Sequence, residues 1–262
     1  MNIIKRELKA NFKSFLIWGI SLVSIYLVAS IEFEGLHGDP AIADAMAQFE
    51  ALFQALGTSS ADMTTPEGYL SILSIYIYLP LAIYSGLLGS GIISKEEKDK
   101  TAEYLFTLPI TRKKVITNKL IVAIIYSLAI DIFIVFGCYL AFIRFNPEPI
   151  FFTFLFNLSI GVFLTELIFL SVGVALSSVL KQYKLSGSIT ISILISTFML
   201  SFLIGFVEEL DFLKYLSPFS YFNSASMLDS SFAISYILIT ILIVASGIST
   251  LLYFYPKRDL YI

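Results

Sequence analysis

Six long apolar stretches, separated by segments that carry most of the charged residues, divide the chain along its whole length. A helix rises 1.5 Å per residue, so roughly 20 residues are needed to cross the hydrocarbon core of a bilayer. Within lipid the backbone must satisfy its own hydrogen bonds, and apolar stretches of this length therefore predict helices. We expect membrane-spanning helices at residues about 14–31, 68–93, 119–143, 150–180, 185–207 and 232–255.

The composition also indicates a membrane protein. Hydrophobic residues make up 57% of the 262 residues and charged residues 14%, with a mean hydropathy of +0.85. Soluble domains have about 45–50% hydrophobic and about 25% charged residues. One cysteine and one histidine are too few for a disulfide framework or a His/Cys zinc site. The net charge of −3 implies no nucleic-acid partner. We therefore expect a single all-α domain over residues 1–262, surrounded by the lipid bilayer and without a metal site.

The positions of lysine and arginine indicate the orientation. Of these 17 residues, 15 lie before the first span, between the second and third, between the fourth and fifth, or after the sixth. Arg144 and Lys214 are the two on the opposite side. Because cytoplasmic loops carry an excess of basic residues, both termini are predicted to be cytoplasmic, in a multi-pass protein of the cell membrane.

Residues 1–13 have the pattern of an amphipathic helix. Ile4, Leu8 and Phe12 recur on one face, and the basic residues occupy the other: Lys5, Arg6, Lys9 and Lys13. Such a helix lies in the membrane interface, with its cations near anionic headgroups. It serves either as a topology anchor or in a functional role.

The first outer loop, residues 32–67, is acidic and contains no lysine or arginine. Residues 41–56 are alanine-rich and amphipathic, and Pro40 is placed to open a helix there. We expect a short outer helix that rests on the membrane or on a partner subunit.

The inner loop, residues 94–118, contains a second short helical pattern. Thr101 can cap a helix over residues 102–108 that Pro109 ends, and Thr111 can cap the helix that leads into the third span. The short helix has an apolar edge formed by Tyr104, Leu105 and Leu108. An apolar edge exposed to the cytoplasm indicates a protein interface, the alternative being a solvated connector.

In the outer segment at residues 208–231, the uninterrupted apolar runs are too short to span the membrane, but the segment as a whole is too apolar for a free loop. Irregular apolar backbone at membrane depth survives where protein or a water-filled cavity surrounds it. We predict two short helices, broken at Pro218, that dip back into the outer leaflet and cap a pathway. The residues around this break include Leu216, Pro218, Phe219, Tyr221 and Phe222.

Two acidic residues, Asp131 and Glu166, lie near the middle of consecutive spans, with no lysine or arginine at that depth. A charge there costs about 2.5–3.5 kcal/mol, so such residues usually face the bundle interior or water. Each is therefore either a functional group on a wet pathway or a neutral acid hydrogen-bonded to a neighbouring helix. In the second span, Pro80 is expected to kink the helix, and the small residues at 85–91 to allow close helix packing.

The chain lacks the motifs of an enzyme. It contains no G-x-x-x-x-G-K-[ST] sequence and no H-E-x-x-H sequence, and its single histidine has no evident partner for serine–histidine chemistry. We therefore expect no catalytic residues and no bound cofactor in this chain.

The sequence resembles the permease subunit of type-2 ABC exporters over essentially its whole length. The resemblance rests on the basic N-terminal helix, the inner segment KTAEYLFTLPITRKKVITNKL at 100–120, the outer segment LKYLSPFSYF at 213–222 and the ending FYPKRDL at 254–260. Six spans in this order complete it.

This resemblance implies partners and roles. It makes the segment at 213–222 the outer gate, formed by Leu216, Pro218, Phe219, Tyr221 and Phe222. Residues 101–108 would be a coupling helix that enters a groove on a cytoplasmic ABC ATPase subunit, beginning at Thr101 and contributing Glu103, Tyr104, Leu105 and Leu108, with Arg112 and Lys113 beside it. Two ATPase copies would carry ATP and Mg²⁺, and a second permease chain, identical or a close paralogue, would complete the complex.

The spans restrict the substrate less sharply. They carry no cation to attract an anionic glycan, and an aromatic-rich interior with two acids would suit a peptide, peptide toxin or drug of amphipathic character. Two alternatives remain open, a sodium-ion exporter and a peptide-binding immunity or sensing component that does not transport.

Overall fold

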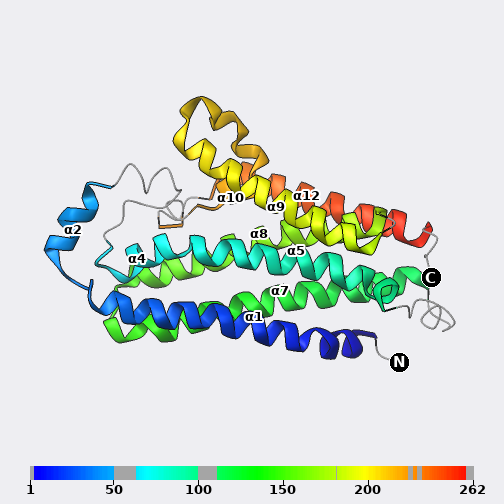
Figure 1. Ribbon diagram of the computed structural model, residues 1–262, viewed down its shortest axis with the longest axis horizontal. Helices are drawn as coiled ribbons and strands as arrows, with labels where there is room; N and C mark the ends of the chain where they lie inside the picture. The colour runs from blue at the N-terminus through cyan, green and yellow to red at the C-terminus, as the bar shows by residue number, and fades with distance from the viewer. Residues whose placement is uncertain are drawn as a thin grey trace.

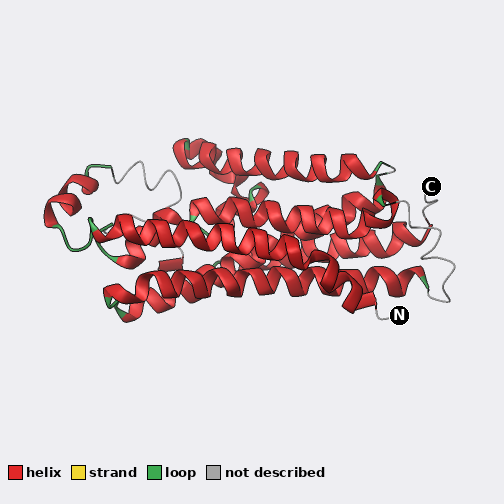
Figure 2. Cartoon of the chain, turned by 60° about the horizontal axis from the view of Figure 1, so that its bottom comes forward, coloured by secondary structure: helices red, strands yellow, loops and turns green. Residues whose placement is uncertain are grey.

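The computed structural model describes residues 3–49, 63–99, 111–180, 182–223, 227–228 and 232–257. Within these ranges the chain is helical and contains no strand, as Figure 2 shows. Six helices are long and apolar enough to cross a membrane, which confirms the number expected from the sequence. They are α1 (Ile3–Glu34), α5 (Ile75–Lys98), α7 (Arg112–Phe142), α8 (Pro149–Val179), α9 (Tyr183–Phe206) and α12 (Ile234–Phe254).

Shorter elements connect the long helices. A short helix, α2 (Pro40–Ala47), begins at Pro40 as predicted but ends within the stretch 41–56 where the helix was expected. The amide of Ala41 donates a hydrogen bond to the carboxylate of Asp39 at 2.9 Å. That α2 lies on the outer side remains a prediction. The other connecting elements are α4 (Pro66–Leu73), η1 (Ile143–Phe145), η2 (Glu208–Leu216), α10 (Pro218–Tyr221) and η3 (Tyr255–Lys257).

The long helices form a bundle with α5 and α8 at its centre. These two helices make the most extensive contact, α1 packs on α7 at one side, and α9 and α12 pack on α5 and α8 at the other (Figure 1). Helix α1 begins and helix α12 ends at the same end of the bundle (Figure 1). Which side of a membrane this end faces remains the prediction made from the basic residues.

Glycines allow α5 and α8 to approach each other closely. A side chain added at Gly89 would meet the backbone carbonyl of Leu170, and one added at Gly173 would lie 2.5 Å from the carbonyl oxygen of Gly86. Real Cβ atoms do not approach a backbone this closely. The small-residue packing surface predicted at 85–91 is therefore confirmed on the side that faces α8.

The structure does not divide the first helix as the sequence suggested. An interfacial helix at 1–13 and a separate span at 14–31 were expected, but α1 is continuous from Ile3 to Glu34. No proline interrupts this stretch, and the side-chain amide of Asn11 donates a hydrogen bond to the carbonyl of Glu7, one turn earlier on the same helix, at 2.9 Å. Whether the first turns lie in a membrane interface remains a prediction.

The second span differs in the opposite way, because one helix was expected at 68–93 and two are present. The interruption between α4 and α5 lies at Ser74, and α5 continues without a break through Pro80. Proline removes one backbone hydrogen bond from the helix, but the helix does not end there. A kink at Pro80 remains a prediction.

Candidate functional site

The predicted coupling residues divide between described and undescribed parts of the chain. Thr101, Glu103, Tyr104, Leu105 and Leu108 lie outside the described residues. The cap expected after them is confirmed, because the hydroxyl of Thr111 accepts a hydrogen bond from the amide of Lys114 at 3.4 Å and α7 begins directly after it.

Arg112 and Lys113 stand at the first turn of α7, at the bundle end where α1 begins (Figure 1). The guanidinium of Arg112 donates a hydrogen bond to the carbonyl of Pro256 at 3.4 Å, which joins the start of α7 to η3. Lys113 is exposed. Lys113 is thus open to a partner, whereas Arg112 also holds the last described segment against α7.

Five charged side chains form an ion cluster at this same end of the bundle. It consists of Arg6 and Glu7 on α1, Lys95 and Glu96 on α5, and Lys119 on α7. Arg6 bridges the two acids, with its Nη2 atom 2.7 Å from Oε1 of Glu7 and 2.8 Å from Oε1 of Glu96. Lys95 approaches Glu7 at 3.4 Å, and Lys119 pairs with Glu96. The cluster therefore ties three helices together.

Lys119, like Glu7, is a fully buried member of the ion cluster. Its side chain is 0% exposed, and its ammonium group donates to the carboxylate of Glu96 and to the carbonyl of Ile92 at 2.5 Å. Removing one partner of a buried ion pair costs about 3–5 kcal/mol, because the remaining charge is left without compensation. Glu96 lies in the last turn of α5 and Lys119 about two turns into α7, so this pair joins the two helices that the inner loop connects.

Sequence reasoning missed the ion cluster. Its members on α1 and α5 lie about 90 residues apart in the chain, as Arg6 and Glu96 show, and each resembles an ordinary charge at a membrane interface. One signal was available, because Glu7 interrupts the basic run of residues 5–13. Ile3 and Glu7, one helical turn apart, are buried, whereas Phe12 of the expected apolar face is exposed.

The two acids expected inside the spans both face the bundle interior. Asp131 on α7 and Glu166 on α8 are buried, and the hydroxyl of Ser159 donates to Oδ2 of Asp131 at 2.5 Å. Both carboxyl oxygens of Glu166 are buried without a hydrogen bond to the described residues, although the hydroxyl of Ser85 lies near them. Ser85 in turn lies 3.2 Å from the hydroxyl of Ser127. We call these five residues the polar centre.

Two tyrosines of α5 border the polar centre. The hydroxyls of Tyr78 and Tyr84 are buried without a hydrogen bond of good geometry to the described residues, although the hydroxyl of Thr165 lies near that of Tyr78. The two tyrosines lie within electrostatic range of Asp131 and Glu166, respectively. Buried polar groups normally have a partner. The polar centre therefore has hydrogen-bonding capacity left over for water or a proton, and within the described residues no group of three or more metal-binding side chains accompanies it.

The predicted outer gate is partly assembled. The expected break is present, since η2 ends at Leu216 and α10 begins at Pro218. Phe219 packs between Phe169 of α8 and Phe198 of α9, with ring centroids 5.3 and 5.0 Å apart. Leu216 is 63% exposed and does not join them. A position within the outer leaflet remains a prediction.

The remaining gate residues anchor the segment to the last span. Tyr221 stacks on Tyr236 of α12 at 4.9 Å and donates a hydrogen bond to the carbonyl of Tyr215. Burial raises the pKa of the Tyr221 phenol to about 12, and Tyr236 adds to the effect. Phe222 is buried and packs edge-on against Phe232 at 5.7 Å. The segment therefore rests on three long helices.

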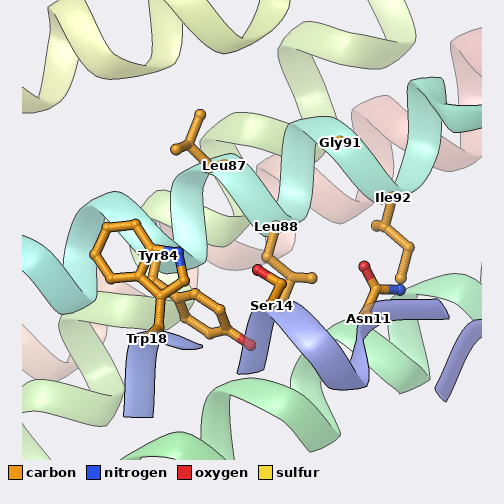
Figure 3. Close-up of a pocket in the computed structure, with 8 residues that line it drawn as sticks. All are labelled: Asn11, Ser14, Trp18, Tyr84, Leu87, Leu88, Gly91 and Ile92. Carbon is orange, nitrogen blue, oxygen red and sulfur yellow. The ribbon is translucent and has the colours of Figure 1, made fainter. Parts of the chain in front are cut away.

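A groove of about 170 Å³ lies between α1 and α5, next to the ion cluster. Figure 3 shows Asn11, Ser14 and Trp18 pointing from α1 toward α5. The facing wall is formed by Tyr84, Leu87, Leu88, Gly91 and Ile92. The Trp18 and Tyr84 rings lie 5.9 Å apart. The groove thus has a mostly apolar wall and a polar edge, and sequence reasoning did not identify it.

Comparison with known protein families places this geometry in context. Residues 1–260 match the family described as ABC-2 family transporter protein. No curated protein matches the chain. The match covers nearly the whole chain and agrees with six helices long enough to span a membrane. The chain therefore belongs to the ABC-2 family of membrane transporters, as a multi-pass permease.

Proposed function

We propose that this chain is the permease subunit of an exporter that a separate cytoplasmic ABC ATPase drives. The observation that carries the proposal is the family match over residues 1–260 on a bundle with six candidate spans. The sequence contains no phosphate-binding loop of its own. The energy for transport is therefore supplied by ATP and Mg²⁺ on the partner subunit, in two copies.

The inner loop is the proposed docking site for the ATPase. Its residues 101–108 form the coupling helix, with Arg112 and Lys113 beside it. The ion cluster supports this assignment, because Glu96 and Lys119 join the two ends of the loop to each other and Arg6 joins Glu96 to α1. A displacement of the loop by the ATPase is then transmitted to three helices together rather than absorbed by a loose connection.

A second permease chain completes the proposed complex. Helices α9 and α12 present apolar side chains to the outside along much of their length, among them Ile234, Leu238 and Leu242. In a bilayer such a surface contacts either lipid or another helix. The family resemblance favours a second copy or a close paralogue over part of this surface.

The proposed substrate is an amphipathic or hydrophobic molecule such as a peptide, peptide toxin or drug. The polar centre supports this choice, since Asp131 and Glu166 lie inside an otherwise apolar bundle. The two acids provide a place for a proton or a positively charged group. No lysine or arginine lies at that depth in the sequence, so nothing there would attract an anionic substrate. Export is the proposed direction.

The test is transport in vesicles that contain the chain together with a cytoplasmic ABC ATPase from the same cell that co-purifies with it. With the cytoplasmic side outward and a fluorescent cationic amphiphile as the probe, we expect ATP-dependent accumulation inside the vesicles. An ATPase variant that cannot hydrolyse ATP is the control. Saturable binding of the probe without accumulation would instead indicate a binding or sensing component and would overturn the proposal.

A further inference from the structure

The groove between α1 and α5 combines an apolar wall with a positively charged end. Its wall is formed by Trp18, Leu87, Leu88 and Ile92, and the ion cluster lies about one helical turn beyond Ile92 and Asn11. An occupant that matches both parts is an amphiphile that lies along the helices with its polar group toward the cluster.

The charge that the ion cluster presents to the outside is positive. Its three cations face two carboxylates, and both carboxylates are buried, with Glu7 0% and Glu96 3% exposed. The members that reach the surface are Arg6, 34% exposed, and Lys95, 31% exposed. A negatively charged group is therefore favoured at this end of the groove.

Open space along the groove is the second requirement, and Gly91 provides it. A Cβ atom added at Gly91 would meet nothing within 4 Å, in contrast to Gly89 on the same helix. The groove extends from Trp18 to Asn11 on α1, seven residues or roughly 10 Å of helix. This length accommodates part of an acyl chain.

We propose that this groove binds an anionic phospholipid, with one acyl chain along Trp18, Leu88 and Gly91 and the phosphate at Arg6 and Lys95. Basic pockets between membrane helices on the cytoplasmic side bind anionic headgroups for this reason. The lipid would bridge α1 and α5 at the ion cluster. Lipid binding at this groove requires neither ATP nor a transported substrate. The lipid proposal is therefore tested separately from the proposed transport function.

Trp18 makes the site directly measurable. It is the single tryptophan of the chain, so all indole fluorescence comes from the groove, and bromine atoms on a lipid chain quench an indole on contact. The purified full chain is reconstituted in phosphatidylcholine bilayers that contain a small, varied fraction of brominated phosphatidylglycerol or brominated phosphatidylcholine. We expect the anionic lipid to quench at lower fractions, by about fivefold for each cation that holds it.

Two variants with matched controls identify the site. Lys95→Gln should reduce the preference for phosphatidylglycerol by about fivefold, whereas Lys257→Gln, at the end of the last span, should leave it unchanged. Gly91→Leu should fill the groove and reduce quenching by both brominated lipids, whereas Val28→Phe, on an exposed part of α1, should not.

Three results would contradict the proposal or one part of it. Equal quenching by the two brominated lipids in the unmodified chain would show ordinary surrounding lipid and overturn the proposal. An undiminished preference in Lys95→Gln would overturn the headgroup position, and unchanged quenching in Gly91→Leu would overturn the chain position. The Gly91→Leu result stands even if Lys95→Gln proves unstable, since Gly91 takes no part in the ion cluster.

Discussion

Lys119 of α7 and Glu96 of α5 form an ion pair inside the bundle, where the side chains are 0% and 3% exposed. The pair joins the two helices that the inner loop connects, and the carbonyl of Ile92 accepts a second hydrogen bond from Lys119. Arg6 of α1 shares the carboxylate of Glu96. The inner loop is thus closed at its base by a buried electrostatic contact that also includes the first helix.

The variant Lys119→Met should destabilise the protein strongly. It keeps the length of the side chain but leaves Glu96 buried with one cation fewer, at a cost of about 3–5 kcal/mol. Thermal unfolding in detergent, followed by the fluorescence of Trp18, measures the effect. Lys113→Met is the matched control on the same helix, and because Lys113 is exposed it should change the stability by no more than about 0.5 kcal/mol.

The double variant Glu96→Gln with Lys119→Met provides a further test of this pair. Replacing both partners removes the uncompensated charge, so we expect the double variant to be more stable than Lys119→Met alone. If the double variant lost as much stability as Glu96→Gln and Lys119→Met lose together, the two side chains would not interact.

The proposed docking segment predicts a loss of assembly without a loss of folding. Tyr104→Ala combined with Leu105→Ala removes the apolar edge expected to enter the ATPase. Co-purification of the ATPase should fall sharply, while the thermal midpoint of the permease alone stays the same. The exposed pair Ile31→Ala and Tyr76→Ala serves as a control, and a complex recovered at full strength with the docking variant would contradict the assignment.

Local sequence patterns predicted much of the fold because they depend on neighbouring residues. Apolar length gave the spans, the Thr111 cap gave the start of α7, and Pro218 gave the break in the outer segment. Each of these features is decided within one or two helical turns. Hydropathy could not tell whether residues 1–13 form a separate helix, since a helix that enters the membrane at an angle and one that lies along it share the same composition.

The ion cluster and the groove could not be predicted in the same way. Glu7 and Lys95 lie 88 residues apart, and their meeting depends on how α1 packs beside α5. A pattern along one helix does not specify that packing. The burial of Asp131 and Glu166 was predictable because lipid makes the alternative too costly, whereas the partner of Asp131, Ser159 on the next helix, became evident from the structure.

Close packing of α5 against α8 predicts opposite effects at two glycines of α5. Gly89→Ala places a methyl group against the backbone carbonyl of Leu170 and should cost about 1–3 kcal/mol through overpacking. Gly91→Ala adds the same group in open space, so it should be neutral or stabilising by up to about 1 kcal/mol through helix propensity. Thermal unfolding of the two variants side by side measures the difference. Equal effects would contradict the helix contact.

The outer segment predicts a graded response at Tyr221. Tyr221→Phe keeps the ring on Tyr236 and loses the hydrogen bond to Tyr215, at about 0.5–1.5 kcal/mol, whereas Tyr221→Ala loses the buried ring as well, at about 3–5 kcal/mol. Leu216→Ala, at an exposed position, should cost little. Unfolding midpoints rank the three variants, and a costly Leu216→Ala would contradict the packing of this segment.

The same phenol predicts a response to alkaline pH. Its pKa is raised to about 12 in the folded protein, above the ordinary value of about 10. The folded state therefore holds the proton more tightly, and the stability gained from this is present below about pH 10 and is lost as the pH rises toward 12. Tyr221→Phe should lose less stability over this range than the unmodified chain, as unfolding at pH 9 and about pH 11 would show.

The polar centre predicts an effect on transport that is separate from folding. Glu166→Gln and Asp131→Asn keep the shape of each side chain but remove the ionisable group, and the amide oxygen introduced by Asp131→Asn would still accept the hydrogen bond from Ser159. If either acid carries a proton or a positive group during transport, ATP-driven accumulation in vesicles should fall while the unfolding midpoint changes by little. Glu34→Gln is the control, because Glu34 is an exposed acid at the end of α1. Normal transport in both variants would show that the two acids serve packing alone, since a neutral amide would then perform everything that the carboxyl group does.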